Sequence, residues 1–138
     1  MRFKYFLSKL NVIALSFAMS YFLVNCTISA KIIDTFVKIK CVSGKGKKIG
    51  KSKTTVRRMN SNPEYHETFI YPLSDDDLED ATMMFQVYAV GKRRKKRDLI
   101  GWFAFGLNNS GTYESNHWQE MSENKDCDVC HWQELKCV

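Results

Sequence analysis

Apolar and charged residues alternate in an early segment of the chain, residues 35–42. Val37 and Ile39 alternate there with Lys38 and Lys40. A period of two directs successive side chains to opposite faces of an extended chain, which is typical of a half-buried strand. We therefore predict a strand with one face in the core and one basic face in solvent.

Several further segments have the composition of short strands and end at glycine, proline or asparagine. Pro72 ends the segment 65–71, for example, and the run 60–63, NSNP, ends the segment before it. Residues 81–90 are mostly apolar on both faces, so we expect this strand in the middle of a sheet. The strands predicted after the first are residues 51–59, 65–71, 81–90, 99–107 and 130–135.

Two short helices are predicted between these strands. Ser74 precedes three aspartates, the pattern of an N-cap with acids in the first turn, so we expect one helical turn around Leu78. Residues 115–124 would place Trp118 and Met121 on one face of a second helix. Short strands at near-regular spacing indicate an all-β fold, an antiparallel β-sandwich with a short helix before its last strand.

The N-terminal segment follows a different pattern. Residues 10–24 are almost wholly apolar after a basic start, and Ile28-Ser29-Ala30 resembles a cleavage site. This is the layout of a secretory signal peptide, although the segment also approaches the length of a membrane anchor. With an anchor, the basic residues that follow would hold the domain in the cytoplasm. We predict a hydrophobic helical leader over 1–30 (signal peptide, anchor or spurious N-terminus) and one domain over 31–138.

Charge is unevenly distributed along the chain. The formal net charge is +6 over 138 residues, a length that suits one domain. Seven basic residues lie in 45–58 and six in 92–97, whereas five acids lie in 75–80. Clustered charge of one sign indicates a partner of the other sign, such as lipid headgroups, nucleic acid or an acidic protein, unless the cluster is only a solvated face.

The two basic runs, KGKKIGKSKTTVRR and KRRKKR, contain no aromatic residue. Proteins that bind single-stranded nucleic acid interleave cations with aromatic side chains on which the bases stack. Runs without aromatics favour attraction to membrane phosphates, at about 1 kcal/mol for each cation near an anionic leaflet. We therefore expect anionic phospholipid as the partner and no nucleic acid.

No arrangement of catalytic residues is recognisable in the sequence. No phosphate-binding loop, G-x-S-x-G or H-E-x-x-H motif is present, and no histidine has a matched nucleophile and carboxylate. Cys127, Cys130 and His131 have the C-x-x-C-H spacing of haem attachment, but the stretch is polar. Zinc would need two further matched ligands, for which Cys137 and His117 are the candidates. We expect no enzyme activity and no cofactor.

Four motifs resemble the C2 domain in their order and spacing. Asp34-Thr-Phe-Val-Lys-Ile-Lys is similar to its D-P-Y-V-K-V strand, and Asn62-Pro-Glu-Tyr-His-Glu-Thr-Phe-Ile-Tyr to its N-P-x-F-N-E-x-F-x-F segment. Asp98-Leu-Ile-Gly resembles the D-x-I-G that follows its third loop. His117-Trp118 with Trp132-Gln-Glu-Leu135 resembles the ending of a synaptotagmin second C2 domain, C2B. The resemblance covers residues 33–136 and is strongest to the calcium-independent synaptotagmin-14/16 branch.

The resemblance implies a C2-type sandwich, but the match begins at the third strand of that fold. Strands one and two have no clear counterpart unless part of residues 10–33 supplies one. We therefore expect an incomplete sandwich, whose exposed sheet edge could pair with another chain to form a homo-oligomer. The calcium ligands of the family would fall at Asp34, Ala89, Gly91 and Asp98. Because Ala89 and Gly91 have no side-chain oxygen, we expect negligible calcium binding.

The resemblance also implies a function: a calcium-independent phospholipid-binding module of vesicle trafficking, exocytosis or membrane tethering. We expect such a module at the cytoplasmic face of the plasma membrane or of vesicles. Its lipid targets would be phosphoinositide or phosphatidylserine, and its protein partners SNARE-type or other trafficking proteins. Two alternatives stay open, a protein-interaction module that oligomerises without lipid and a secreted C2-derived protein whose leader is cleaved. The expected lipid contacts are Lys47, Lys48, Lys51, Lys53, Arg57 and Arg58 on the basic strand, and Lys92, Arg93, Arg94, Lys95, Lys96 and Arg97 in the basic loop.

Overall fold

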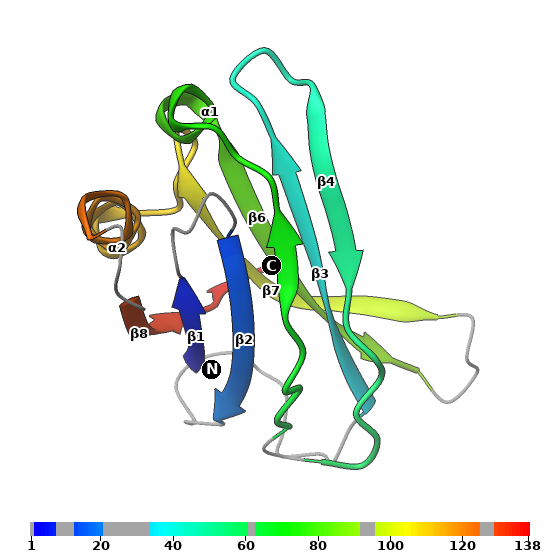
Figure 1. Ribbon diagram of the computed structural model, residues 1–138. Helices are drawn as coiled ribbons and strands as arrows, with labels where there is room; N and C mark the ends of the chain where they lie inside the picture. The colour runs from blue at the N-terminus through cyan, green and yellow to red at the C-terminus, as the bar shows by residue number, and fades with distance from the viewer. Residues whose placement is uncertain (1, 8–12, 21–33, 61–62, 92–95, 125–128) are drawn as a thin grey trace.

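The chain folds into antiparallel β-sheets and short helices, and the computed structural model describes residues 2–7, 13–20, 34–60, 63–91, 96–124 and 129–138. In chain order the elements are β1 (Arg2–Leu7), β2 (Ile13–Ser20), β3 (Asp34–Val42), β4 (Lys48–Lys53), β5 (Phe69–Tyr71), α1 (Asp75–Asp80), β6 (Thr82–Val90), β7 (Arg97–Gly106), α2 (Thr112–Glu123), β8 (Val129–Glu134) and β9 (Lys136–Cys137). One sheet has the order β5-β2-β1-β8 and the other the order β4-β3-β6-β7-β9. The two sheets form the layers of a sandwich (Figure 1).

The core lies between the layers and follows the alternation in the sequence. Val37 and Ile39 of β3 are fully buried, and their cross-strand partners on β6 are Val87 and Phe85, which are also buried. Phe85 stacks on Phe103 of β7 with ring centroids 4.7 Å apart. Burying each side chain of this size contributes about 1.5–3 kcal/mol. As expected, β6 lies in the middle of its sheet, between β3 and β7.

Strands β4 and β5 differ from the predicted segments 51–59 and 65–71. The chain leaves the ladder after Lys53, where Thr54 turns inward and its Oγ1 accepts a hydrogen bond of 2.9 Å from the backbone N–H of Val37. His66 has a φ of 48°, which no extended strand allows, so β5 begins only at Phe69. Contacts with other segments, not local composition, therefore set both boundaries.

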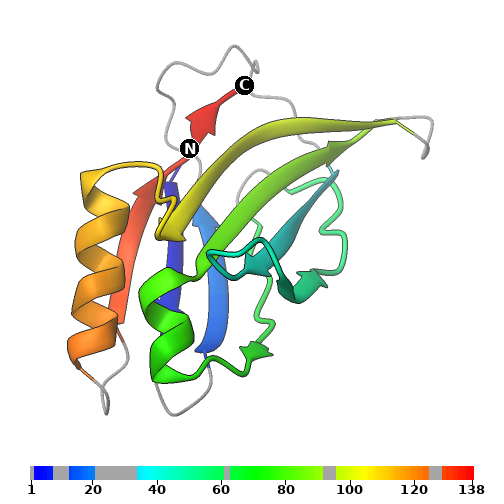
Figure 2. The same ribbon diagram turned by 90° about the horizontal axis from the view of Figure 1, so that it is seen from above.

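The two helices confirm the predicted capping and burial patterns. Ser74 caps α1 in a capping box, in which Asp77 N–H donates to Ser74 Oγ at 3.1 Å and Ser74 N–H donates to Asp77 Oδ2 at 3.1 Å. Trp118 and Met121 of α2 are buried, and Trp118 Nε1 donates to the carbonyl of Leu78 at 3.2 Å. Both helices lie at one end of the sandwich, away from the ends of β6 and β7 near residues 91–97 (Figure 2).

The N-terminal expectation needs correction, because strands replace the predicted hydrophobic helix and the missing first strands. β1 pairs with β2 and β8, and β2 pairs with β5, so they form the middle of the second sheet. A short apolar run is compatible with a leader, a helix or a buried strand, and periodicity alone does not separate them. The cleavage-site residues 28–30 lie outside the described residues, so a cleaved leader stays a prediction. Among the described helices, none combines the length and hydropathy needed to cross a bilayer.

Candidate functional site

Four lysines face one another across β3 and β4. In the ladder Lys38 pairs with Lys53, and Lys40 pairs with Lys51. Because Ile39 between them points into the core, all four lysine side chains leave the sheet on its outer surface. We call these four residues the lysine face.

In the part of the chain that the structure describes, the lysine face lacks compensating negative charge. Within the described residues, no carboxylate forms an ion pair with any of the four lysines. Partial burial, followed by the nearby charges of Arg97 and the other three lysines, lowers the pKa of Lys38 below its usual range. Like charges directly opposite each other in a ladder are destabilising, so an anion bound here would relieve repulsion.

Two aromatic rings lie under the cations of the lysine face and form cation–π contacts with them. Phe36 and Tyr88 stack with ring centroids 5.3 Å apart and planes 9° from parallel. Lys53 Nζ lies 4.3 Å from the centroid of Phe36, and Lys38 Nζ lies 4.5 Å from that of Tyr88. The guanidinium carbon of Arg97 lies 5.6 Å from the Phe36 ring. Cation–π contacts of this kind contribute about 0.5–1 kcal/mol each and limit the positions that the cations can take.

A hollow of about 490 Å³ lies beside the lysine face, where β3 and β7 begin and β6 ends. We call it the loop-end hollow. Arg58 and Arg97, both exposed, line it together with Lys53. Its full lining is Asp34, Phe36, Lys53, Val56, Arg58, Met59, Val90 and Arg97.

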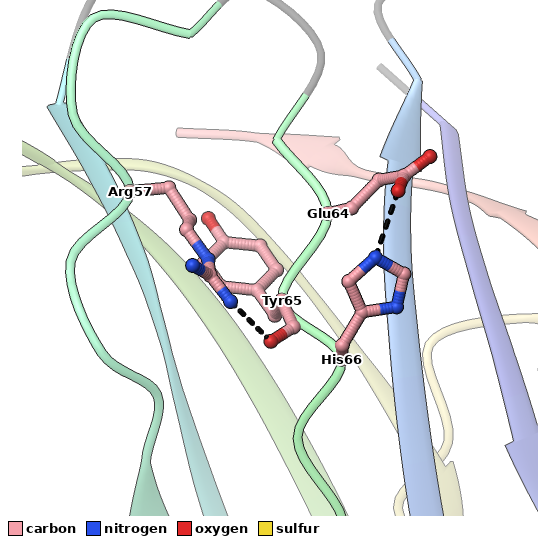
Figure 3. Close-up of polar contacts among 4 residues, drawn as sticks. All are labelled: Arg57, Glu64, Tyr65 and His66. Atoms are coloured by element: carbon pink, nitrogen blue, oxygen red, sulfur yellow. Dashed lines mark hydrogen bonds and ion pairs between the residues drawn. The ribbon is translucent and has the colours of Figure 1, made fainter.

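Arg57, next to this hollow, forms structural contacts instead. Its backbone exchanges two hydrogen bonds of 2.9 Å with Thr35, and its Nη2 donates to the carbonyl of Tyr65 at 2.6 Å (Figure 3). The buried Tyr65 hydroxyl in turn shares a hydrogen bond of 2.7 Å with Thr35 Oγ1. The exposed side chains of Glu64 and His66 lie beside these contacts, with Glu64 Oε2 2.8 Å from His66 Nε2 (Figure 3). Arg57 thus joins three segments of the chain.

The two carboxylates at the predicted calcium position lie on opposite faces of the sheet. Asp34 pairs with Val90, whereas Asp98 pairs with Ala89. Val90 and Ala89 are neighbours on β6, so their rows of side chains point in opposite directions.

Each of these carboxylates also has a partner in the protein. Asp34 Oδ1 accepts a hydrogen bond of 3.0 Å from the backbone N–H of Met59, and Asp98 lies 3.6 Å from Lys96 Nζ. The part of the chain that the structure describes holds no group of three or more His, Cys, Asp or Glu side chains that could bind a metal ion. Calcium independence nevertheless stays a prediction.

Comparison with known families assigns the fold. Residues 23–121 match the family model described as "C2 domain". The chain belongs to the C2 domain family. It is 34% identical over 103 residues to Synaptotagmin-B of Diplobatis ommata, and 32% identical over 102 residues to Synaptotagmin-11 of Rattus norvegicus. These alignments cover 75% and 74% of this chain but 23% of each relative, so this C2 domain spans less than a quarter of their length.

Solved C2 domains have the same fold. A C2 domain of RIM from Drosophila matches with a TM-score of 0.66 at 16% identity, covering 98% of this chain and 97% of that one. The third C2 domain of the KIAA1228 protein matches with a TM-score of 0.68 at 16% identity, covering 98% and 87%. The sandwich predicted from the sequence motifs is therefore confirmed as a C2 fold.

Two further predicted lipid contacts of this C2 domain, Lys47 and Lys48, lie apart from the lysine face. Lys47 and Lys48 line a separate hollow with three aspartates, near the end of β4 that is remote from Lys53. Hydrogen bonds from Ser74 and, to a smaller extent, the charge of Lys47 lower the pKa of Asp77 in this hollow. Lys92, Arg93, Arg94 and Lys95 lie outside the described residues.

Sequence reasoning missed Lys38 and Lys40, half of the lysine face. Their alternation with Val37 and Ile39 already placed them on a solvent-facing surface. What the sequence lacked was the register that brings them opposite two lysines of β4, because pairing between strands is not encoded in either strand alone.

The residues of the C-x-x-C-H motif that the structure describes, Cys130 and His131, lie next to helix α2 in this C2 domain. Cys130 is a half-buried free thiol, Cys127 lies outside the described residues, and His131 Nε2 lies 2.8 Å from Glu120 Oε2. His117 is buried with its ring centroid 4.2 Å from that of His131. Burial, followed by the charge of His131, lowers the pKa of His117 to about 4. We therefore interpret His117 as a neutral core residue.

Proposed function

We propose that this C2 domain is a calcium-independent phospholipid-binding module of vesicle trafficking, exocytosis or membrane tethering. It docks through the lysine face on anionic membranes that contain phosphatidylserine or phosphoinositide, at the cytoplasmic face of the plasma membrane or of vesicles. The observation that carries the proposal is the opposition of four lysines across β3 and β4 without a carboxylate partner among the described residues. The similarity to synaptotagmins supports a membrane-associated role.

The expected strength of this docking is modest. Four lysines at about 1 kcal/mol each give about 4 kcal/mol, which corresponds to a dissociation constant of about 1 mM. Arg97 and the basic run 92–95 are proposed to add to this attraction, as the sequence suggests. The attraction is screened over about 8 Å at physiological salt, so binding should be reversible and sensitive to salt.

The test replaces all four lysines of the lysine face by glutamine and measures cosedimentation with phosphatidylserine vesicles. We expect a loss of about tenfold or more in affinity, with wild-type binding weakened by added salt and unchanged between calcium and chelator. The matched control removes the same charge elsewhere, at the exposed residues Lys45, Lys47, Lys48 and Lys136. Equal losses in the two variants, or binding that requires calcium, would contradict the proposal.

A second candidate function is a protein-interaction module. Tyr113, 80% exposed, and Trp132, 47% exposed, line one hollow between α2 and β8. Exposed aromatic residues are enriched at protein interfaces, so this surface suits a trafficking protein or a second copy of the chain. Sedimentation without lipid distinguishes the two functions by measuring association between protein chains. Association that persists when the four lysines are replaced, but is lost in the Tyr113→Ser variant, would favour the protein-interaction function.

A further inference from the structure

The hollow that contains Tyr113 and Trp132 has a volume of about 350 Å³ and lies where the start of α2 meets β8. We call it the α2–β8 hollow, and its lining is Tyr113, Glu114, Trp132, Gln133, Glu134 and Lys136. Two carboxylates and one ammonium group leave it a formal charge of −1, opposite in sign to the lysine face. A concave site of this sign is suited to a small cationic group.

Glu114 is the unusual member of this lining, because it is charged and yet only 3% exposed. Within the part of the chain that the structure describes, its carboxylate forms no hydrogen bond or ion pair. Withdrawing a carboxylate from water without a partner costs free energy, and an arriving cation would offset that cost. Glu114 therefore points to a positively charged ligand.

The start of α2 fixes the position of this carboxylate. A Cβ built on Gly111, the N-cap of α2, would lie 3.0 Å from Glu114 Oε2, so glycine leaves the space in which the carboxylate lies. α2 runs alongside β8, and His131 Nε2 of the strand lies 2.8 Å from Glu120 Oε2 of the helix (Figure 2). These contacts place the site before a ligand binds, which lowers the cost of ordering it.

Two exposed aromatic side chains line the same hollow from different elements. Tyr113 precedes Glu114 on α2, and Trp132 belongs to β8. Aromatic faces attract cations, and tryptophan does so most strongly. A guanidinium group suits this combination, because its plane stacks on aromatic rings and its paired N–H groups match a carboxylate. The ammonium group of lysine is a point charge without this planar match.

We infer that the α2–β8 hollow binds an arginine side chain of a partner protein. Glu114 accepts hydrogen bonds from the guanidinium group, and Tyr113 and Trp132 are its aromatic walls. The inference rests on the second candidate function, the protein-interaction module, and names the chemistry of its partner. It does not depend on membrane docking, because no residue that lines the hollow belongs to the lysine face.

The test titrates the chain with an acetylated and amidated pentapeptide that has one arginine between glycines. NMR follows the indole N–H of Trp132 and the backbone N–H of Tyr113. Matched peptides carry lysine in place of arginine, or citrulline, which has nearly the shape of arginine but no charge. We expect the citrulline peptide to bind about tenfold more weakly than the arginine peptide, and the lysine peptide about threefold more weakly.

Glu114→Gln keeps the shape of the side chain and removes its charge. It should weaken binding of the arginine peptide by about tenfold and abolish the difference between the arginine and citrulline peptides, because both changes remove the same interaction. Tyr113→Ser, at an exposed position, should weaken the arginine peptide by about threefold. The control, Glu123→Gln, removes the same charge at the exposed end of α2 and should leave peptide binding unchanged.

Equal binding of the arginine and citrulline peptides to the wild-type chain would overturn the inference, as would an arginine preference that survives in Glu114→Gln. Lipid-free association that is lost on Tyr113→Ser, without an arginine preference, would overturn the arginine site and leave the protein-interaction function standing. Glu114→Gln should still cosediment with phosphatidylserine vesicles at least as well as the wild type, so a failure of membrane docking is recognised separately.

Discussion

Arg57 illustrates how one residue's contacts change the meaning of a basic run. In the sequence it belongs to the lysine- and arginine-rich segment 45–58, yet in the fold its guanidinium donates to the Tyr65 carbonyl and its backbone bonds to Thr35. The neighbouring Arg58 is exposed beside the loop-end hollow. Two adjacent arginines therefore have different roles, one in stability and one at the surface.

We expect Arg57→Gln to lower the free energy of unfolding by about 1–3 kcal/mol, because it removes a charged hydrogen bond at a partly buried carbonyl. Urea unfolding measures this change. Arg58→Gln is the matched control and should change stability by less than about 0.5 kcal/mol. Similar effects of the two substitutions would contradict the structural role of Arg57.

The buried His117 leads to a prediction about how the stability of the fold depends on pH. Its pKa is about 4 in the folded chain, below the 6.5 of an unperturbed histidine, so the unfolded chain binds the proton more readily. Its contribution to stability is therefore complete above about pH 6.5 and is lost as the pH falls toward 4, by about 3 kcal/mol. Unfolding measured across this range should show a shallower slope for His117→Gln. The exposed His66→Gln serves as the control, and a slope that His117→Gln leaves unchanged would refute the assignment.

At the scale of elements, β3 and β6 were predictable almost to their ends. Alternation defined β3 and an apolar run defined β6, because both strands bury side chains that the sequence shows directly. β4 and β5 were predicted less well, since Thr54 bonding to Val37 and the φ of His66 decide where they stop. Such boundaries depend on partners that are distant in sequence.

Gly106 lies where the end of β7 meets the start of β6, and it gives a prediction at this scale. Its φ is 83°, and a Cβ at this position would lie 2.0 Å from the carbonyl oxygen of Ala81. That carbonyl accepts the backbone N–H of Leu107 at 2.9 Å, so it cannot move away without breaking the turn.

We expect Gly106→Ala to destabilise the fold by more than about 2 kcal/mol in thermal or urea unfolding. Gly46→Ala is the matched control, because Gly46 has a φ of 76° but nothing within 4 Å of its Cβ position. That substitution carries only the backbone strain, about 1 kcal/mol. Equal losses would show that the contact with Ala81 is unimportant.

At the scale of the whole molecule, charge is separated across the sandwich. The loop-end hollow lies beside the end of β6 and the start of β7, whereas α1, with three aspartates in its first turn, precedes the opposite end of β6; the lysine face lies between them along β3 and β4. The second sheet depends on β1 and β2, which pair with β8 and β5, so strands within residues 2–20 take part in the sandwich.

The sequence by itself determined the all-β class, the basic outer side of β3 and the two regions of opposite charge, because period and composition are local properties. Only the tertiary structure decided that Lys38 and Lys40 oppose Lys53 and Lys51, that Arg97 meets Lys53 over one phenylalanine ring, and that Asp34 and Asp98 face apart. The physical reason is strand register. A shift of one residue turns every side chain of a strand to the other face, and register is set by the packing of the whole core.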